Sequence, residues 1–211
     1  MNKTSNAARI PLVIGALLGS MALSACAPLL LGGAVVGTTL MVTDRRSSGA
    51  QVEDQGIELK ALTRIREAVG ERGHISVTSY NRLVLLTGEV QSEDDKAAVE
   101  RAITRIENVK STVNELLVGG SSSLTSRSND TIITSKVKAS FLDAGDMPGT
   151  AVKVVTERGT VYLMGRVTER EANRAAEVAR GVGGVTKVIK VFEPITEAEL
   201  ADLSPKSVPK K

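Results

Sequence analysis

The sequence predicts an α+β protein made of two tandem copies of one α-β-β-α-β unit, each with a small mixed three-stranded sheet and its helices packed on one face. Residues 75–118 and 152–192 share one pattern of apolar residues and glycines, in which Gly88 corresponds to Gly165. Aromatic residues make up only 2% of the chain and tryptophan is absent, so aliphatic residues must form the cores. A chain of 211 residues has room for two such small domains.

Each copy is expected to contain a β-hairpin. Apolar residues alternate at Ile75 and Val77, and again at Val152 and Val154, as in a strand with one buried face. A short polar turn and a second apolar strand follow in both copies. The turns are expected at residues 80–82 and 157–159, and the second strands at 83–90 and 160–167.

A helix and a third strand complete each copy. Ser92 and Thr168 each precede acidic residues, with an acid three positions later, which is the pattern of an N-cap followed by a first helical turn. The glycines at 181–184 are expected to end the second of these helices, and the third strands are expected near 109–118 and 185–192. The expected core residues of the two helices are Ala98, Val99, Ala102, Ile103 and Ile106, and Ala172, Ala175, Ala176, Val178 and Ala179.

A further helix is expected before each hairpin, at residues 57–69 and 130–142. The first has one apolar face, which a helical wheel assigns to Ile57, Ala61, Leu62, Ile65, Ala68 and Val69. The second has a core face and a second apolar arc, which includes Ile132, Ala139 and Leu142 beside Ser135, bordered by Lys136 and Lys138. Apolar side chains rimmed by amines match the boundary of an anionic lipid layer.

The first 25 residues have the pattern of a secretory signal peptide, with Lys3 and Arg9 before an apolar stretch. Leu23-Ser24-Ala25-Cys26 resembles the lipobox of bacterial lipoproteins, in which the cysteine thiol receives a diacylglyceryl group and the amine freed by cleavage is acylated. Because Ala27 is not the aspartate that commonly retains such proteins at the inner membrane, the resemblance implies the periplasmic face of the outer membrane. The alternative is a transmembrane helix within the uncharged residues 10–42, which the prolines and glycines there disfavour.

No arrangement of residues typical of a catalytic or metal site is visible in the sequence. His74 is the only histidine and stands at the start of a predicted strand, where a surface or packing role is expected. The glycines at 181–184 end a helix, whereas a phosphate-binding loop precedes one. A net charge of only +3, interspersed charges and few aromatic residues argue against a nucleic-acid partner. We therefore expect a non-catalytic protein without a metal or cofactor.

The two copies resemble the BON domain, named after bacterial OsmY and nodulation proteins. The second copy carries the typical hairpin at 159–167 (GTVYLMGRV) and the typical end at 184–189 (GVTKVI), while the first has Asn108-Val109 in place of Gly-Val. Together with the lipobox and Asp44-Arg45-Arg46-Ser47, these motifs make the chain similar to dual-BON outer-membrane lipoproteins.

The resemblance implies a role in outer-membrane integrity, enrichment at division sites, and binding of anionic phospholipid such as phosphatidylglycerol or cardiolipin through the first helix of the second domain. In that family an aromatic residue acts as a membrane wedge at the position of Ile132. The residues expected to bind phospholipid are Ile132, Ser135, Lys136, Lys138, Ala139 and Leu142. One alternative is that Ile132 and Leu142 pack on the first domain; another is an adaptor that docks envelope-assembly proteins through this surface or a sheet edge.

These features divide the chain into six parts. The signal peptide is expected at residues 1–25, a lipidated apolar segment and linker at 26–51, and the first BON domain at 52–118. A Gly/Ser linker is expected at 119–128, the second BON domain at 129–193, and a disordered tail at 194–211.

Overall fold

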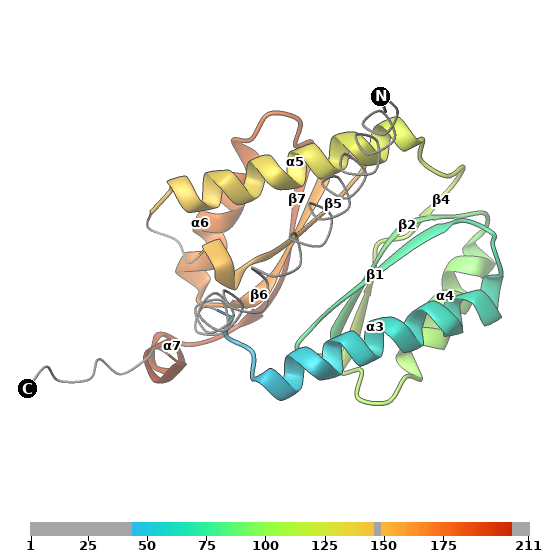
Figure 1. Cartoon of the computed structure of the whole chain (residues 1–211), viewed down its shortest axis with the longest axis horizontal. Helices are drawn as coiled ribbons and strands as arrows, with labels where there is room; N and C mark the ends of the chain where they lie inside the picture. Colours follow the sequence, from blue (N-terminus) through green and yellow to red (C-terminus); the bar gives the residue numbers. More distant parts are fainter. Residues whose placement is uncertain (1–43, 146–148, 204–211) are drawn as a thin grey trace, which may run out of the picture. The chain divides into compact units, whose positions relative to one another are not determined.

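The computed structural model describes residues 44–145 and 149–203 (Figure 1). The first copy contains α3 (Ser48–Val69), β1 (His74–Tyr80), β2 (Leu83–Val90), α4 (Glu93–Thr104), β3 (Ser111–Asn114) and β4 (Leu117–Val118). The second contains α5 (Leu124–Asp143), the 3₁₀ turn η1 (Gly149–Ala151), β5 (Lys153–Glu157), β6 (Thr160–Val167), α6 (Glu169–Arg180), β7 (Lys187–Pro194) and α7 (Glu197–Leu203). The expected signal peptide, Cys26 and the alternative membrane helix lie outside the described residues.

Each copy forms a small mixed sheet with its second strand in the centre. β2 pairs antiparallel with β1 and parallel with β3, and β6 pairs in the same way with β5 and β7. β4 continues along β2 beyond β3, because the expected single strand is interrupted where the Asn114 side chain accepts the amide of Leu116 at 3.2 Å. The predicted α+β architecture of two α-β-β-α-β units is confirmed.

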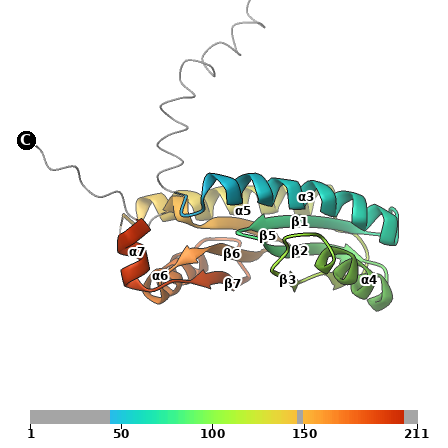
Figure 2. The same ribbon diagram turned by 90° about the horizontal axis from the view of Figure 1, so that it is seen from below.

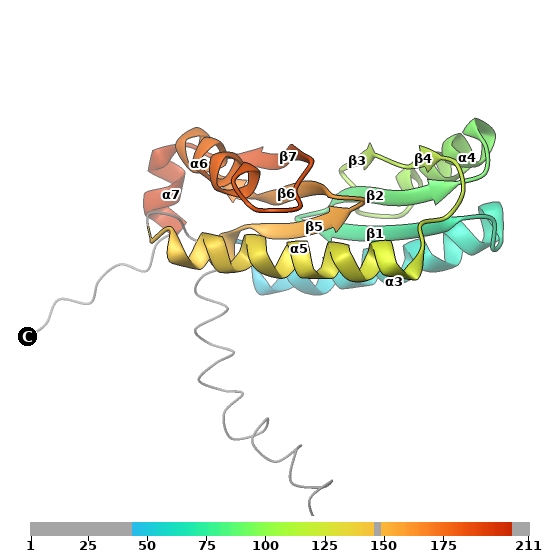
Figure 3. The same cartoon turned by 90° about the horizontal axis from the view of Figure 1, so that it is seen from above.

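The helices of each copy pack on one face of its sheet. Figure 2 shows α3 lying along β1, and Figure 3 shows α5 lying along β5. Val84 and Leu86 of β2 join the core under α3 and α4, and Val161 and Leu163 of β6 join the core under α5 and α6. Because side chains alternate along a strand, the intervening residues point to the opposite face.

The opposite faces of the two sheets meet in a third apolar cluster. Its buried members are Tyr80, Leu85, Tyr162, Met164 and Val191. Ion pairs join the two copies beside this cluster, from Lys153 to Glu58 at 3.2 Å and from Arg158 to Glu89 at 3.4 Å. The two domains therefore contact each other through the faces of their sheets that the helices leave uncovered.

Both hairpins have two-residue turns with a left-handed backbone. Asn81 and Arg82 have φ of 50° and 68°, and Arg158 and Gly159 have φ of 50° and 72°. Such pairs of positive φ values define the type I′ turn, whose twist matches that of the strands. The turns predicted at 80–82 and 157–159 are confirmed.

A buried carboxylate from the leading helix holds each of these turns. Asp54 of α3 accepts hydrogen bonds from the two turn amides of the first hairpin at 2.7 and 2.8 Å. Asp130 of α5 accepts hydrogen bonds from the two turn amides of the second hairpin, both at 2.8 Å. The repeat thus ties the leading helix to the far end of its own hairpin, a contact that the sequence analysis did not predict.

The helices α4 and α6 begin where the sequence predicts. The Ser92 hydroxyl accepts the amide of Asp95, and Thr168 forms a complete capping box with Glu171. The second helix also ends as predicted, with Gly181 as its C-cap residue.

The leading helices start earlier than predicted. Ser47 caps α3 and Ser123 caps α5, and each serine hydroxyl accepts the amide three residues on. Residues 48–51 and 124–128, which the sequence analysis assigned to linkers, are therefore helical.

The expectation of a disordered tail is wrong for the part that the structure describes. Pro194 belongs to β7, and residues 197–203 form α7. The first turn of α7 is closed by Thr196, whose amide and hydroxyl both donate to Glu199. Residues 204–211 lie outside the described residues.

Candidate functional site

All six residues predicted to bind phospholipid lie exposed on one side of α5. Ile132 is 53% exposed and Leu142 is 69% exposed. On the other side of the same helix, Ile133, Val137 and Phe141 are buried in the domain core. The alternative in which Ile132 and Leu142 pack on the first domain is therefore wrong, because the domains meet through their sheets.

The charges on this side of α5 are two lysines and one acid, Asp143, which is exposed next to Leu142. Lys136 and Lys138 flank the apolar residues, and within the described part of the chain neither forms an ion pair. The carboxylate of Asp130 is 95% buried and is engaged with the hairpin turn, so it does not offset the lysines at the surface. We name the exposed side of α5, with its six predicted residues, the α5 face.

The α5 face also includes Leu124, which the sequence analysis missed. This leucine is 78% exposed and precedes Leu142 by 18 residues, or five helical turns, so the two side chains project from the same side. They lie about 27 Å apart along the helix axis. The overlooked signal was Ser123, an N-cap residue that follows two glycines and two serines and was therefore assigned to the linker.

Exposed apolar residues also occur on α3, contrary to the prediction of one apolar face. Leu62 was expected in the core but is 54% exposed, and Val52 and Leu59 are exposed as well. The exposed side of α3 carries Glu67, which pairs with Arg64 at 3.0 Å, whereas Lys136 and Lys138 beside the α5 face form no ion pair among the described residues. The two helices thus differ in whether the cations beside their exposed apolar residues are paired with an acid, which makes α3 a matched comparison for α5.

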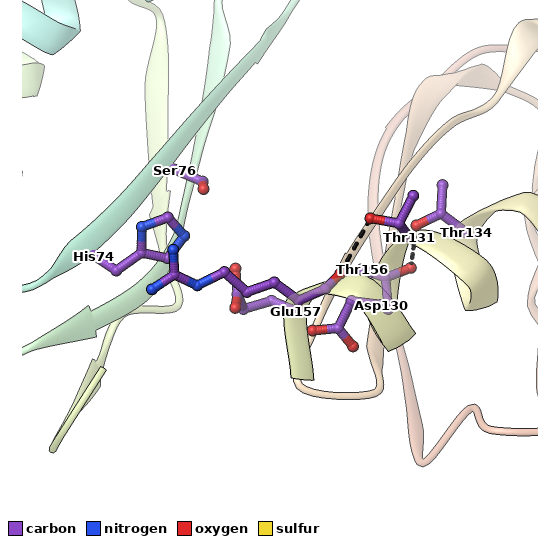
Figure 4. A pocket seen from close by; sticks show the side chains of 8 residues that line it. His74, Ser76, Asp130, Thr131, Thr134, Thr156 and Glu157 are labelled. Atoms are coloured by element: carbon purple, nitrogen blue, oxygen red, sulfur yellow. Dashed lines mark hydrogen bonds between the residues drawn. The ribbon is translucent and has the colours of Figure 1, made fainter. Parts of the chain in front are cut away.

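A polar cavity of about 190 Å³ lies on the other side of α5, between this helix and β1 (Figure 4). His74 and Ser76 of β1 stand opposite Thr134, whose hydroxyl donates to that of Thr156 at 2.7 Å. His74 is half-buried, consistent with the surface or packing role predicted for it. Among the described residues, no group of three or more His, Cys, Asp and Glu side chains is arranged to hold a metal ion.

Glu157, at the edge of this cavity, is a buried carboxylate with acidic neighbours. Burial raises the pKa of Glu157, and the charges of Glu89 and Asp130 raise it further. Glu89 is itself fully buried and accepts the amide of Ser122 at 3.1 Å in addition to its contact with Arg158. Ionised Glu157 therefore weakens the folded state.

Replacing Glu157 by glutamine is expected to stabilise the protein at pH 7. The folded-state pKa lies above the unfolded one, so ionisation at neutral pH costs about 1.4 kcal/mol for each unit of that difference. This cost disappears as the pH falls through the raised pKa to the ordinary value of 4.5. Urea unfolding at pH 7 and pH 4.5 should show a gain for Glu157→Gln only at pH 7, with exposed Glu71→Gln as the control. A loss of stability at pH 7 would contradict this assignment.

Comparisons with known proteins agree with this architecture. The model of the BON domain matches residues 54–120 and 129–193. The outer membrane lipoprotein DolP of Haemophilus influenzae is 34% identical over 187 residues, which cover 88% of this chain and 95% of that protein. The 21 kDa hemolysin of Actinobacillus pleuropneumoniae is 35% identical over 151 residues, covering 71% of this chain and 78% of the hemolysin.

More distant similarities cover shorter parts of the chain. Osmotically-inducible protein Y of Escherichia coli is 32% identical over 117 residues, which cover 54% of this chain and 58% of that protein. The C-terminal domain of CdsD, a structural protein of the type III secretion system of Chlamydia trachomatis, superposes with a TM-score of only 0.28 at 10% identity, over 65% of this chain and 98% of that one. Within residues 44–145 and 149–203, no helix is long and apolar enough to cross a bilayer. Two matched domains and a third of identical residues over most of its length show that this chain belongs to the BON-domain family.

Proposed function

We propose that this chain is a non-catalytic lipoprotein, anchored at the periplasmic face of the outer membrane, whose second BON domain binds anionic phospholipid through the α5 face. The lipobox at Cys26 and the similarity to an outer membrane lipoprotein support this location. Each buried methylene group contributes about 0.8 kcal/mol, so three acyl chains on Cys26 hold the protein at the bilayer. Its proposed role is to support outer-membrane integrity, including at division sites.

The observation that carries the proposal is the exposure of Ile132 and Leu142 beside Lys136 and Lys138, two lysines that form no ion pair with the residues that the structure describes. Aliphatic side chains gain about 25 cal/mol for each Å² removed from water, which favours their entry into the acyl boundary. Each lysine near an anionic surface adds about 1 kcal/mol. The resulting affinity is modest, but the acyl anchor raises the effective concentration of lipid, so that a weak contact is sufficient.

The position of the family's aromatic wedge is occupied by Ile132, which has no indole or phenol group to settle among the headgroups. The exposed leucines at the two ends of the α5 face, Leu124 and Leu142, supply apolar area on either side of it. We therefore expect α5 to lie flat along the boundary, with several aliphatic contacts in place of one aromatic anchor.

Liposome flotation of the compact unit Thr43–Lys211, which contains all three apolar clusters and lacks the acylated cysteine, tests the proposal. We expect this unit to float with vesicles of phosphatidylcholine and phosphatidylglycerol and to stay behind with phosphatidylcholine alone. Ile132→Glu with Leu142→Glu should reduce binding at least tenfold, because each loss of about 1.4 kcal/mol is a tenfold loss of affinity. Leu59→Glu with Leu62→Glu, the matched pair on α3, should leave flotation unchanged.

Each other outcome counts against part of the proposal. If the double variant in α3 no longer floats while the double variant in α5 still does, the lipid-binding surface lies on the first domain and not on the α5 face. A wild-type unit that never floats would contradict lipid binding and favour the adaptor, which uses the same face or the edge strand β7 to dock envelope-assembly proteins.

A further inference from the structure

The segment that connects the anchor region to α3 lies against both domains. Arg45 and Arg46 are adjacent in sequence, yet their side chains are only 11% and 14% exposed. Arginines close to a membrane anchor commonly face anionic headgroups. Here both guanidinium groups are engaged by protein, one by each domain.

Arg45 binds the second domain. Its guanidinium donates to both carboxylate oxygens of Glu171, at 2.7 and 2.8 Å, and to the carbonyl of Arg166 at 2.9 Å. Arg166 in turn donates to the carbonyl of Arg45 at 3.2 Å. Two parallel hydrogen bonds to a buried carboxylate fix both the distance and the orientation of the segment.

Arg46 binds the first domain. Its Nη1 lies 2.8 Å from Asp54, the carboxylate that holds the first hairpin turn, and its guanidinium carbon lies 4.3 Å from the centre of the Tyr80 ring. Asp44 contacts the same guanidinium at 2.6 Å and keeps it in this orientation. Tyr80 belongs to the apolar cluster between the sheets, so Arg46 closes one edge of the domain contact.

Comparison of the two copies shows that these contacts are not part of the repeated unit. In the first copy, the carboxylate equivalent to Glu171 is Asp95, which pairs with Arg72 of its own domain at 2.9 Å. In the second copy, Asp130 holds its turn with two amide contacts, and among the described residues no arginine side chain pairs with it. Arg45 and Arg46 are therefore additions that only the connecting segment supplies.

We infer that the two domains together form a binding site for residues 44–47, in which Arg45 and Arg46 act as a clasp that fixes one domain relative to the other. Residues 44–47 thus lie at the junction of the two domains. This inference is independent of lipid binding, because none of its contacts involves the α5 face.

Pulsed electron–electron resonance between two spin labels tests the clasp in Thr43–Lys211. Thr104→Cys and Arg180→Cys place the labels at the exposed ends of α4 and α6, one in each domain. The wild-type background should give one narrow distance distribution. Arg45→Gln with Arg46→Gln should broaden it or add a second population, and Arg64→Gln with Arg66→Gln, two exposed arginines of α3, should leave it unchanged.

If Arg45→Gln with Arg46→Gln leaves the distance distribution unchanged, the inference is overturned. A loss of helicity in the first turn of α6 would then show only that the two arginines have a local role. Circular dichroism shows whether the variant folds. If it does not, Arg45→Lys with Arg46→Lys decides the question, since lysine retains the charge but loses the two-pronged contact and the stacking on Tyr80. The lysine variant should broaden the distribution to an intermediate extent, and a lysine variant with a distribution as narrow as that of the wild type would overturn the inference.

Discussion

Replacing Asp54 by alanine is expected to lower the free energy of unfolding by about 3–5 kcal/mol, because breaking a buried ion pair leaves its partners without compensation. The carboxylate accepts hydrogen bonds from Ser79 at 2.6 Å, from the turn amides at 2.7 and 2.8 Å, and from Arg46 at 2.8 Å. The alanine variant leaves all of these donors without their acceptor in a site that is nearly inaccessible to water.

Urea unfolding at pH 7 measures this loss, and the matched change Asp143→Ala at the exposed end of α5 should cost far less. Asp130→Ala should have an intermediate effect, because that carboxylate holds its turn without an arginine. Equal losses for Asp54→Ala and Asp143→Ala would show that the buried network contributes little.

The same carboxylate predicts how stability depends on pH. Burial acts to raise the pKa of Asp54, but the hydrogen bonds from Ser79, Arg82, Arg46 and Asn81 outweigh it and hold the pKa below its ordinary value of 3.8. The folded state therefore binds this proton less tightly than the unfolded state, and the stabilisation is fully present above pH 3.8. It is lost as the pH falls through the lowered pKa, so the difference between wild type and Asp54→Ala should shrink in acid.

The features that the sequence predicts correctly are the local ones. The caps at Ser92 and Thr168 and the two-residue turns depend on neighbours within a few positions, so a single stretch of sequence carries the signal. The bracing of each turn by Asp54 or Asp130 joins residues about 28 positions apart. Such pairings leave no periodic pattern, and for the same reason the contacts of Arg45 were not predicted.

The exposure of the six α5 residues was predicted more completely than the packing of the neighbouring helix. Helical periodicity is enough to separate Ile132 and Leu142 from the core side of α5, and the structure has both side chains exposed. The same reasoning placed Leu62 in the core, because a helical wheel gives the direction of a side chain but not the width of the buried strip. In α3 that strip is narrow, and Ile57, Ala61, Ile65 and Val69 fill it.

The second large effect is expected at Gly88, in the central strand of the first domain. Its φ is 111°, and a Cβ atom built there would lie 2.0 Å from the backbone oxygen of His74 on the paired strand. A side chain therefore has to push β1 away from β2 while the backbone stays in a conformation that L-residues rarely adopt. We expect Gly88→Ala to cost more than about 3 kcal/mol, the upper range for backbone strain alone, because strand pairing is lost as well.

Gly56 in α3 is the matched control for this change. No atom lies within 4 Å of a Cβ built on Gly56, so Gly56→Ala should leave stability unchanged or raise it by up to about 1 kcal/mol through the better helix propensity of alanine. Gly165, the counterpart of Gly88 in the second domain, would bring a Cβ to 2.5 Å from the oxygen of Ala151, which predicts a smaller loss than at Gly88. Urea unfolding followed by circular dichroism ranks the three variants. If Gly88→Ala were as stable as Gly56→Ala, the close approach of β1 to β2 would not explain the glycine at position 88. The glycines at equivalent positions of the two copies would then need another explanation.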